Sequence, residues 1–191
     1  MRHPFVFIYL IGVLVAWVTR IVQTKDHHKV RTTRILWPEL SLMVLWFIAS
    51  QVLPLIYYFT PIFKFANYSM PNFVSVIGVG VFGLAIWLLW RSHVDLGQNW
   101  SPIAEIQTQQ VLVTQGVYRY LRHPMYSAHI LWGIAQGILI SNWLVGSGGI
   151  ITFALLYWVR VPQEEALMQA HFGQHYGAYK QATGAVIPKL L

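Results

Sequence analysis

The sequence predicts an all-α integral membrane protein with about five transmembrane helices in a single membrane domain, residues 1–191. Hydrophobic residues make up 56% of the chain, charged residues only 10%, and the mean hydropathy is +0.51. Soluble domains carry about 25% charged residues, so a soluble enzyme of this size could not cover its surface with so few charges. A disordered chain is excluded as well, because it would be polar and rich in charge.

The predicted spans follow the apolar runs of the sequence. We expect the first at about 4–22, the second at about 38–60 with a kink at Pro54, and the third at about 72–90. The apolar stretch 127–160 is shorter than the roughly 40 residues that two full spans need. It therefore predicts a tight hairpin of two short or tilted helices.

The C-terminal segment predicts an amphipathic helix outside the spans. Pro162 is expected to end the last span and to start a new helix, with Glu164 and Glu165 in its first turn, where the helix dipole favours acids. Apolar and aromatic residues then recur at helical spacing: Leu167, Met168, Phe172, Tyr176 and Tyr179. A helix of this kind lies along the membrane surface.

The basic residues predict the orientation in the membrane. The chain has 13 Lys and Arg against 6 Asp and Glu, and with these spans all the basic residues except Arg2 and Lys64 fall on one side. The positive-inside rule makes that side cytoplasmic, with the N-terminus outside and the C-terminus inside. Basic loops beside an anionic leaflet explain the excess charge, and no nucleic-acid partner is expected. Chemistry that needs ionisable groups is then confined to the cytoplasmic face, so 1–90 is interpreted as three N-terminal spans and 91–191 as the catalytic region.

Three glycine or histidine patterns are interpreted as structural. The G-x-G-x-x-G match at 78–83 lies inside an apolar span and not between a strand and a helix, so close helix packing is expected there. Gly133 and Gly137 are interpreted in the same way. His171 and His175 have the spacing of metal ligands, but no third ligand is obvious nearby, so no metal site is expected.

Three polar clusters are candidates for chemistry. The segment 110–118 reads as a short extended stretch and a turn at Gly116, whose backbone could bind a nucleoside edge or simply form a loop. The run 122–126 begins the fourth span with Pro124 in its first turn. From there one helix face carries four residues that line a pocket or bond to other helices: Tyr126, His129, Gly133 and Gln136. The third cluster is Arg160 with the acids that follow it, either a snorkelling arginine with a charged helix start or a functional group.

In combination these residues resemble the isoprenylcysteine carboxyl methyltransferase family and the related phospholipid methyltransferases. The resemblance rests on Arg122-His123-Pro124-x-Tyr126, a span hairpin, Glu164-Glu165, and Phe172-Gly173-x-x-Tyr176-x-x-Tyr179, together with Gly116-Val117-Tyr118. It covers roughly residues 91–188. The family's usual histidine before the loop is replaced here by Pro102.

The resemblance implies a membrane methyltransferase that uses S-adenosylmethionine, bound at the cytoplasmic end of the helices under the C-terminal helix. It places cofactor contacts on Gln110, Val111, Leu112, Val113, Tyr118, His123, Pro124, Met125, Tyr126 and Glu164. Glu105 matches a family glutamine only across a gap. Arg160 matches an arginine beside the substrate and is expected to hold the acceptor carboxylate, with His129 and Gln136 as further acceptor contacts. The expected acceptor is lipid-like or prenylated and enters from the bilayer.

Other functions stay open from the sequence. N-methylation of a phospholipid amine or S-methylation of a thiol would require a base, for which Glu165 and His129 are candidates, so Glu165 joins Arg160 as a predicted catalytic residue. The chain could also be a membrane scaffold or a small transporter. A transporter would usually show inverted repeats and ionisable residues at the midplane, and neither is visible.

Overall fold

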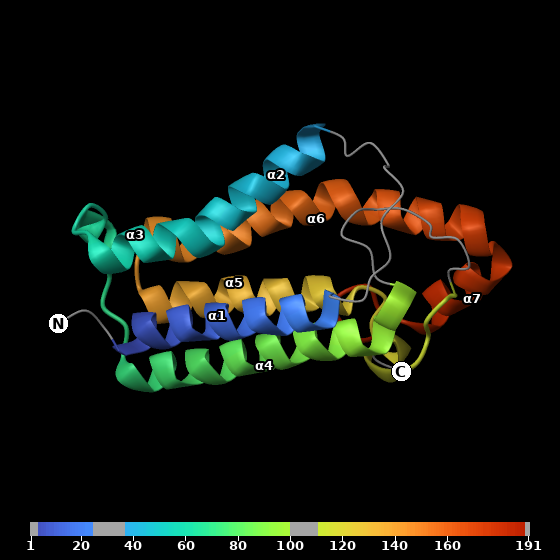
Figure 1. Ribbon diagram of the computed structural model, residues 1–191, viewed down its shortest axis with the longest axis horizontal. Helices are drawn as coiled ribbons and strands as arrows, with labels where there is room; N and C mark the ends of the chain where they lie inside the picture. The colour runs from blue at the N-terminus through green and yellow to red at the C-terminus, as the bar shows by residue number, and fades with distance from the viewer. Residues whose placement is uncertain (1–3, 25–36, 100–110, 190–191) are drawn as a thin grey trace.

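The computed structural model describes residues 4–24, 37–99 and 111–189, and these form a bundle of long helices (Figure 1). The helices are α1 (Pro4–Thr24), α2 (Trp37–Phe47), α3 (Leu53–Phe59), α4 (Asn72–Leu96), α5 (Pro124–Ile140), α6 (Trp143–Phe172) and α7 (Gln174–Ala182). α4 packs against α1 and α5, α5 also packs against α6, and α6 packs against α2. The described residues contain no β-strand, as the sequence predicts.

Four helical segments are long and apolar enough to cross a membrane: Pro4–Gln23, Glu39–Phe59, Asn72–Asn99 and Trp143–Phe172. α5 has 17 residues and is shorter than the roughly 20 residues of a full span. The hairpin of α5 and α6 therefore pairs one short helix with one of 30 residues, which continues well beyond residue 160, where the predicted last span ends. α4 also continues beyond the predicted end of the third span, to Leu96.

Small residues let the two helices of the hairpin approach closely. A Cβ added at Gly133 would lie 2.8 Å from the Cα of Ile150, and one at Gly146 would lie 3.1 Å from the Cα of Gly137. The predicted packing role of Gly133 and Gly137 is confirmed. In the 78–83 motif, Gly78 also allows close packing, because a Cβ there would collide with the Ile138 side chain of α5. A Cβ at Gly80 or Gly83 would have no atom within 4 Å.

The second span has a π-helical segment, Ile48–Val52, directly before α3. The Leu53 N–H bonds to the carbonyl of Ile48, five residues back, and Pro54 has no N–H. The carbonyls of Ala49 and Ser50 thereby lose their ordinary helical donors. The predicted kink at Pro54 thus takes the form of a π-helical segment whose carbonyls need partners from other helices.

Gln136 and Tyr9 supply those partners. Gln136 Nε2 donates to the Ala49 carbonyl at 2.9 Å and to the Val145 carbonyl at 2.7 Å, and the Tyr9 hydroxyl lies 2.7 Å from the Ser50 carbonyl. Both side chains are fully buried. The prediction that Gln136 contacts the acceptor does not agree with this position, because its amide on α5 bonds to the π-helical segment and to α6.

α6 continues without a break through Pro162 as far as Phe172, so the predicted new helix at Pro162 is wrong. A proline inside a helix removes one backbone hydrogen bond but does not always end the helix. The break comes at Gly173, which has a φ of +53°, and α7 begins at the next residue. Arg160 and Glu164 consequently lie one turn apart on the same helix.

Candidate active site

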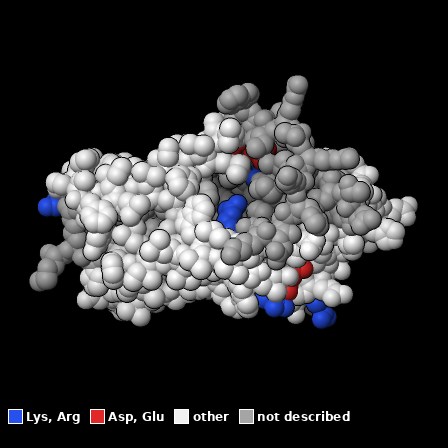
Figure 2. All heavy atoms as spheres, in the orientation of Figure 1, with Lys and Arg blue, Asp and Glu red and all other residues white. Residues whose placement is uncertain are grey.

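A cavity of about 510 Å³ lies at one end of the bundle, between α1, α2, α4, α5 and α6. Ligand pockets in proteins span roughly 300–1,000 Å³. Figure 2 shows a hollow on this side of the molecule with a blue basic side chain inside it. Much of the wall is apolar or aromatic and includes Trp17, Trp46, Phe47, Leu89, Trp132, Phe153 and Leu156.

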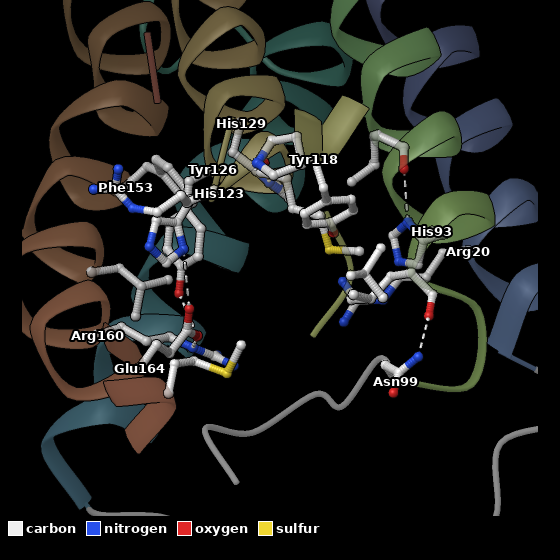
Figure 3. Close-up of a pocket in the computed structure, with 18 of the residues that line it drawn as sticks. Arg20, His93, Asn99, Tyr118, His123, Tyr126, His129, Phe153, Arg160 and Glu164 are labelled. Atoms are coloured by element: carbon white, nitrogen blue, oxygen red, sulfur yellow. Dashed lines mark hydrogen bonds and ion pairs between the residues drawn. The ribbon is translucent and has the colours of Figure 1, made fainter. Parts of the chain in front are cut away.

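The polar part of the cavity is built around Glu164 (Figure 3). One of its carboxylate oxygens, Oε1, accepts hydrogen bonds from the Tyr126 hydroxyl at 2.8 Å and from Arg160 Nε at 2.7 Å. Arg160 Nη1 lies 3.3 Å from Oε1 of Glu39 on α2. The guanidinium therefore lies between two carboxylates, and the continuity of α6 across Pro162 is what places Arg160 and Glu164 on the same face.

The C-terminal residues hold the beginning of α5 in place. Arg122 N donates to the Gly184 carbonyl at 2.8 Å, and His123 N donates to the Ala185 carbonyl at 2.9 Å. Tyr179 on α7 donates its hydroxyl to the Tyr118 carbonyl at 2.6 Å. Burial raises the pKa of the Tyr118 and Tyr179 phenols above their ordinary value, so both hydroxyls stay protonated and act as donors.

Glu165 points away from the cavity and ties α6 to α7. Its carboxylate accepts from Arg122 at 2.9 and 3.0 Å, lies 2.5 Å from the Lys180 ammonium, and lies 3.2 Å from His123 Nε2. Successive residues of a helix are rotated by about 100°, so only one of two adjacent glutamates can face the cavity. The predicted catalytic role of Glu165 therefore does not agree with its position, because its carboxylate joins α6 to Arg122 and to Lys180 of α7.

The segment after the third span reaches the cavity through a turn at Gly116. Gly116 has a φ of +60°, and a Cβ there would collide with the Asp95 carboxylate. Asp95 accepts a hydrogen bond from Val117 N at 2.8 Å and pairs with Arg91 at 2.8 Å. Asp95 thus fixes the turn that carries Tyr118 to the cavity.

His129 faces the cavity from α5. Its Nδ1 donates to the Met125 carbonyl at 2.6 Å, and its ring stacks on Phe153 with the ring centroids 5.1 Å apart. The carbonyl can only accept, so Nδ1 carries a proton. Nε2 is the nitrogen left for a ligand.

The structure brings most of the predicted site residues together. Those that line the cavity are Val111, Leu112, Val113, Tyr118, His123, Pro124, Met125, Tyr126, His129, Arg160 and Glu164. Gln136 and Glu165 do not line it, and Gln110 and Glu105 lie outside the described residues. The sequence interpretation missed Arg20, Glu39, His93 and Asp95. Their shared signal is that they are polar residues within or at the ends of apolar spans, where such residues are rare.

Several helices long and apolar enough to cross a membrane, with a ligand-sized cavity of mixed polarity at one end, define a multi-pass membrane protein with a binding cavity. A comparison with protein families adds a name to this class: the isoprenylcysteine carboxyl methyltransferase (ICMT) family matches residues 76–170. The chain belongs to this family. The matched segment contains α5, most of α4 and α6, and both Arg160 and Glu164.

Relatives and a solved structure agree with the family. A probable protein-S-isoprenylcysteine O-methyltransferase from Oryza sativa subsp. indica is 29% identical over 122 residues, which cover 61% of this chain and 62% of the relative. Protein-S-isoprenylcysteine O-methyltransferase B from Arabidopsis thaliana is 25% identical over 145 residues, 73% of this chain and 72% of the relative. The solved structure of the eukaryotic intramembrane Ras methyltransferase ICMT is 25% identical, with a TM-score of 0.62 over 94% of this chain and 63% of that one. The chain thus spans less than two thirds of the rice relative and of the solved structure.

Proposed function

We propose that the chain is an S-adenosylmethionine-dependent methyltransferase that methylates the carboxylate of a prenylated or similarly apolar acceptor at the cytoplasmic membrane face. The observation that carries the proposal is the hydrogen-bonded group of Tyr126, Glu164 and Arg160 in a cavity whose wall is in large part apolar or aromatic. The orientation proposed with it has the N-terminus outside and the C-terminus inside.

The residues of the cavity fit the cofactor. S-adenosylmethionine, when bound, supplies a methyl group activated by a positively charged sulfur. Glu164 is the carboxylate that would hold the ammonium group or the ribose hydroxyls. The hydrogen bonds from Tyr126 and Arg160 both go to Oε1, one of its two oxygens, and the side chain stays 21% exposed. The Tyr126 ring would stabilise a sulfonium by a cation–π contact of about 0.5–2 kcal/mol. The segment of Val111, Leu112 and Val113 would hold the nucleoside.

The reaction makes few chemical demands on the protein. A carboxylate oxygen of the acceptor would attack the methyl carbon from the side opposite the sulfur, while the methyl–sulfur bond breaks and S-adenosylhomocysteine leaves, so alignment would supply most of the catalysis. The acceptor is already ionised and needs no base. Arg160 would orient the carboxylate, and the apolar tail would lie along the wall formed by Trp17, Trp46 and Phe47.

Methylation of an amine or a thiol is the alternative function, and His129 is the residue that favours including it in an acceptor screen. His129 lines the cavity, and its Nε2 is unprotonated in the neutral ring whose Nδ1 donates to Met125, so His129 could act as the base. An acceptor screen with prenylcysteine carboxylates, phospholipid amines and small thiols separates these reactions.

Calorimetric titration of the detergent-purified protein with S-adenosylhomocysteine tests the cofactor assignment. We expect binding in the wild type, loss of binding in Glu164→Ala, and wild-type affinity in Gln163→Ala, which changes the neighbouring residue outside the cavity lining. A folded wild type that does not bind would overturn the proposal. Wild-type affinity in folded Glu164→Ala would remove Glu164 from the cofactor site.

A further inference from the structure

A second hollow lies on the side of α6 that faces away from the cavity. It has a volume of about 510 Å³ and lies between α6, α7 and Arg122, just before α5. α6 lines it with Pro162 and Ala166, and lines the cavity with Arg160 and Glu164. Residues two apart on a helix point about 200° apart, so the two hollows lie on opposite sides of α6. We call the second hollow the α7 groove.

A stripe of exposed side chains on α6 leads into the α7 groove. Ile151, Leu155 and Trp158 are 57%, 44% and 73% exposed. Pro162 and Ala166 are exposed too and continue the stripe at helical spacing. In a membrane-spanning helix such a stripe faces lipid, and from Ile151 to Pro162 it measures roughly 16 Å, about half of the roughly 30 Å hydrocarbon core. A lipid chain that follows the stripe therefore brings its headgroup to the α7 groove.

The α7 groove carries one net positive charge. Among the described residues that line it, those with a formal charge are Arg122, Glu165 and Lys180. Glu165 pairs with Arg122 at 2.9 Å and with Lys180 at 2.5 Å. The Lys180 side chain is 49% exposed, whereas that of Arg122 is 9% exposed. An ammonium has three N–H donors and Glu165 takes one of those of Lys180, so Lys180 has donors for an anion at the groove surface.

We infer that the α7 groove binds the headgroup of an anionic phospholipid, with an acyl chain along the α6 stripe. The phosphate accepts hydrogen bonds from Lys180, and the net positive charge of the groove favours a lipid that is negatively charged. A zwitterionic lipid brings its own ammonium group and gains less from that charge. A soluble phosphate has the charge but no chain to cover the stripe. This lipid site is separate from the proposed cofactor and acceptor sites and does not depend on the proposed function.

Native mass spectrometry of the detergent-purified protein tests the site, with phosphatidylglycerol and phosphatidylcholine of the same acyl chains added in equal amounts. We expect the wild type to bind phosphatidylglycerol about fivefold more tightly, which is the preference that one basic residue near an anionic lipid gives. Lys180→Gln removes the net charge and should bring the two affinities close together, whereas Lys180→Arg keeps the charge and the preference. Lys189→Gln is the matched control, because it removes an exposed lysine outside the groove lining and leaves the preference unchanged.

Ala166→Trp tests the groove by its shape and leaves all three charges in place. Ala166 is exposed and lines the groove, so the larger side chain occupies the space of the headgroup. We expect the affinity for phosphatidylglycerol to fall to that for phosphatidylcholine. A loss in this variant cannot come from removing the ion pair between Lys180 and Glu165.

Three results would overturn the lipid site: equal affinities in the wild type, the wild-type preference in folded Lys180→Gln or in folded Ala166→Trp, or displacement of the lipid by glycerol 3-phosphate at equal concentration. The last result would assign the groove to a soluble phosphate ester. Where one variant does not fold, as judged by its melting temperature, the other decides.

Discussion

Two neighbouring glutamates on α6 have different surroundings. Glu164 accepts hydrogen bonds from Tyr126 and Arg160 at the cavity. Glu165 instead accepts hydrogen bonds from Arg122 and pairs with Lys180 of α7. The sequence marks both as one acidic pair, and only the rotation of the helix separates them. Because Arg160 and Glu164 are ion-paired, a change at either is expected to affect cofactor and acceptor together.

Tyr126→Phe removes the hydroxyl that Glu164 accepts at 2.8 Å. This bond orients the Glu164 carboxylate, and a hydrogen bond to a charged group contributes about 1.5–3 kcal/mol. We therefore expect a lower affinity for S-adenosylhomocysteine, with a loss of up to that free energy, about tenfold to a hundredfold. Calorimetric titration measures it. Tyr157→Phe is the control, because Tyr157 contacts the Tyr126 ring but does not line the cavity. Equal affinities in the two variants would contradict the role of the Tyr126 hydroxyl.

His129→Leu and Gln136→Leu are expected to have opposite effects. His129 faces the cavity, so its loss should reduce turnover more than the melting temperature. Gln136 bonds to two backbone carbonyls in the core, and leaving buried acceptors unpaired costs about 1–3 kcal/mol each, so its loss should lower the melting temperature strongly. Thermal melts in detergent and methyl-transfer assays on both variants check this. The reverse order of effects would exchange the two assignments.

At the scale of the elements, apolar runs were enough to predict the helices but not where they end. The second span changes to π-helical bonding directly before Pro54, whereas Pro162 does not interrupt α6. Contacts across Pro162 give the physical reason: Arg160 pairs with Glu164 within the helix, and Glu165 pairs with Arg122 and Lys180 beyond it. Local proline chemistry predicts a break, and only the tertiary contacts oppose it.

Gly133→Ala tests the contact between α5 and α6. Its new Cβ would lie 2.8 Å from the Cα of Ile150, so the helices must move apart, and we expect a lower melting temperature. Gly80→Ala has open space and gains helix propensity of about 0.5–1 kcal/mol, so it should melt at the same or a higher temperature. If Gly133→Ala melted no lower than Gly80→Ala, the close packing would not be needed for stability.

At the scale of the whole molecule, motifs in α5 and α6 predicted one wall of the cavity and left the other unassigned. The residues contributed by α1 and α2, Arg20, Trp17, Trp46 and Phe47 among them, belong to apolar runs that carry no motif. Their placement depends on how α1 and α2 pack against the hairpin. Spacing along the chain does not contain that information.

The proposed orientation is testable because the chain has no cysteine. Single cysteines introduced as Lys64→Cys and Gln174→Cys would both be exposed and lie at opposite ends of the helices. We expect a membrane-impermeant maleimide to label Lys64→Cys from the outside of sealed cells and to reach Gln174→Cys only after the membrane is opened. Labelling of Gln174→Cys alone from outside would invert the topology.

The bonds between residues 184–186 and the beginning of α5 have a consequence for biosynthesis. Gly184 and Ala185 accept from Arg122 and His123, and the Val186 carbonyl accepts from Ser127 at 2.7 Å. The ribosome must therefore translate past residue 186 before His123 acquires its final surroundings. A chain that stopped before residue 184 would lack these contacts, so the beginning of α5, where the proposed cofactor site lies, would be completed only after all the spans have been made.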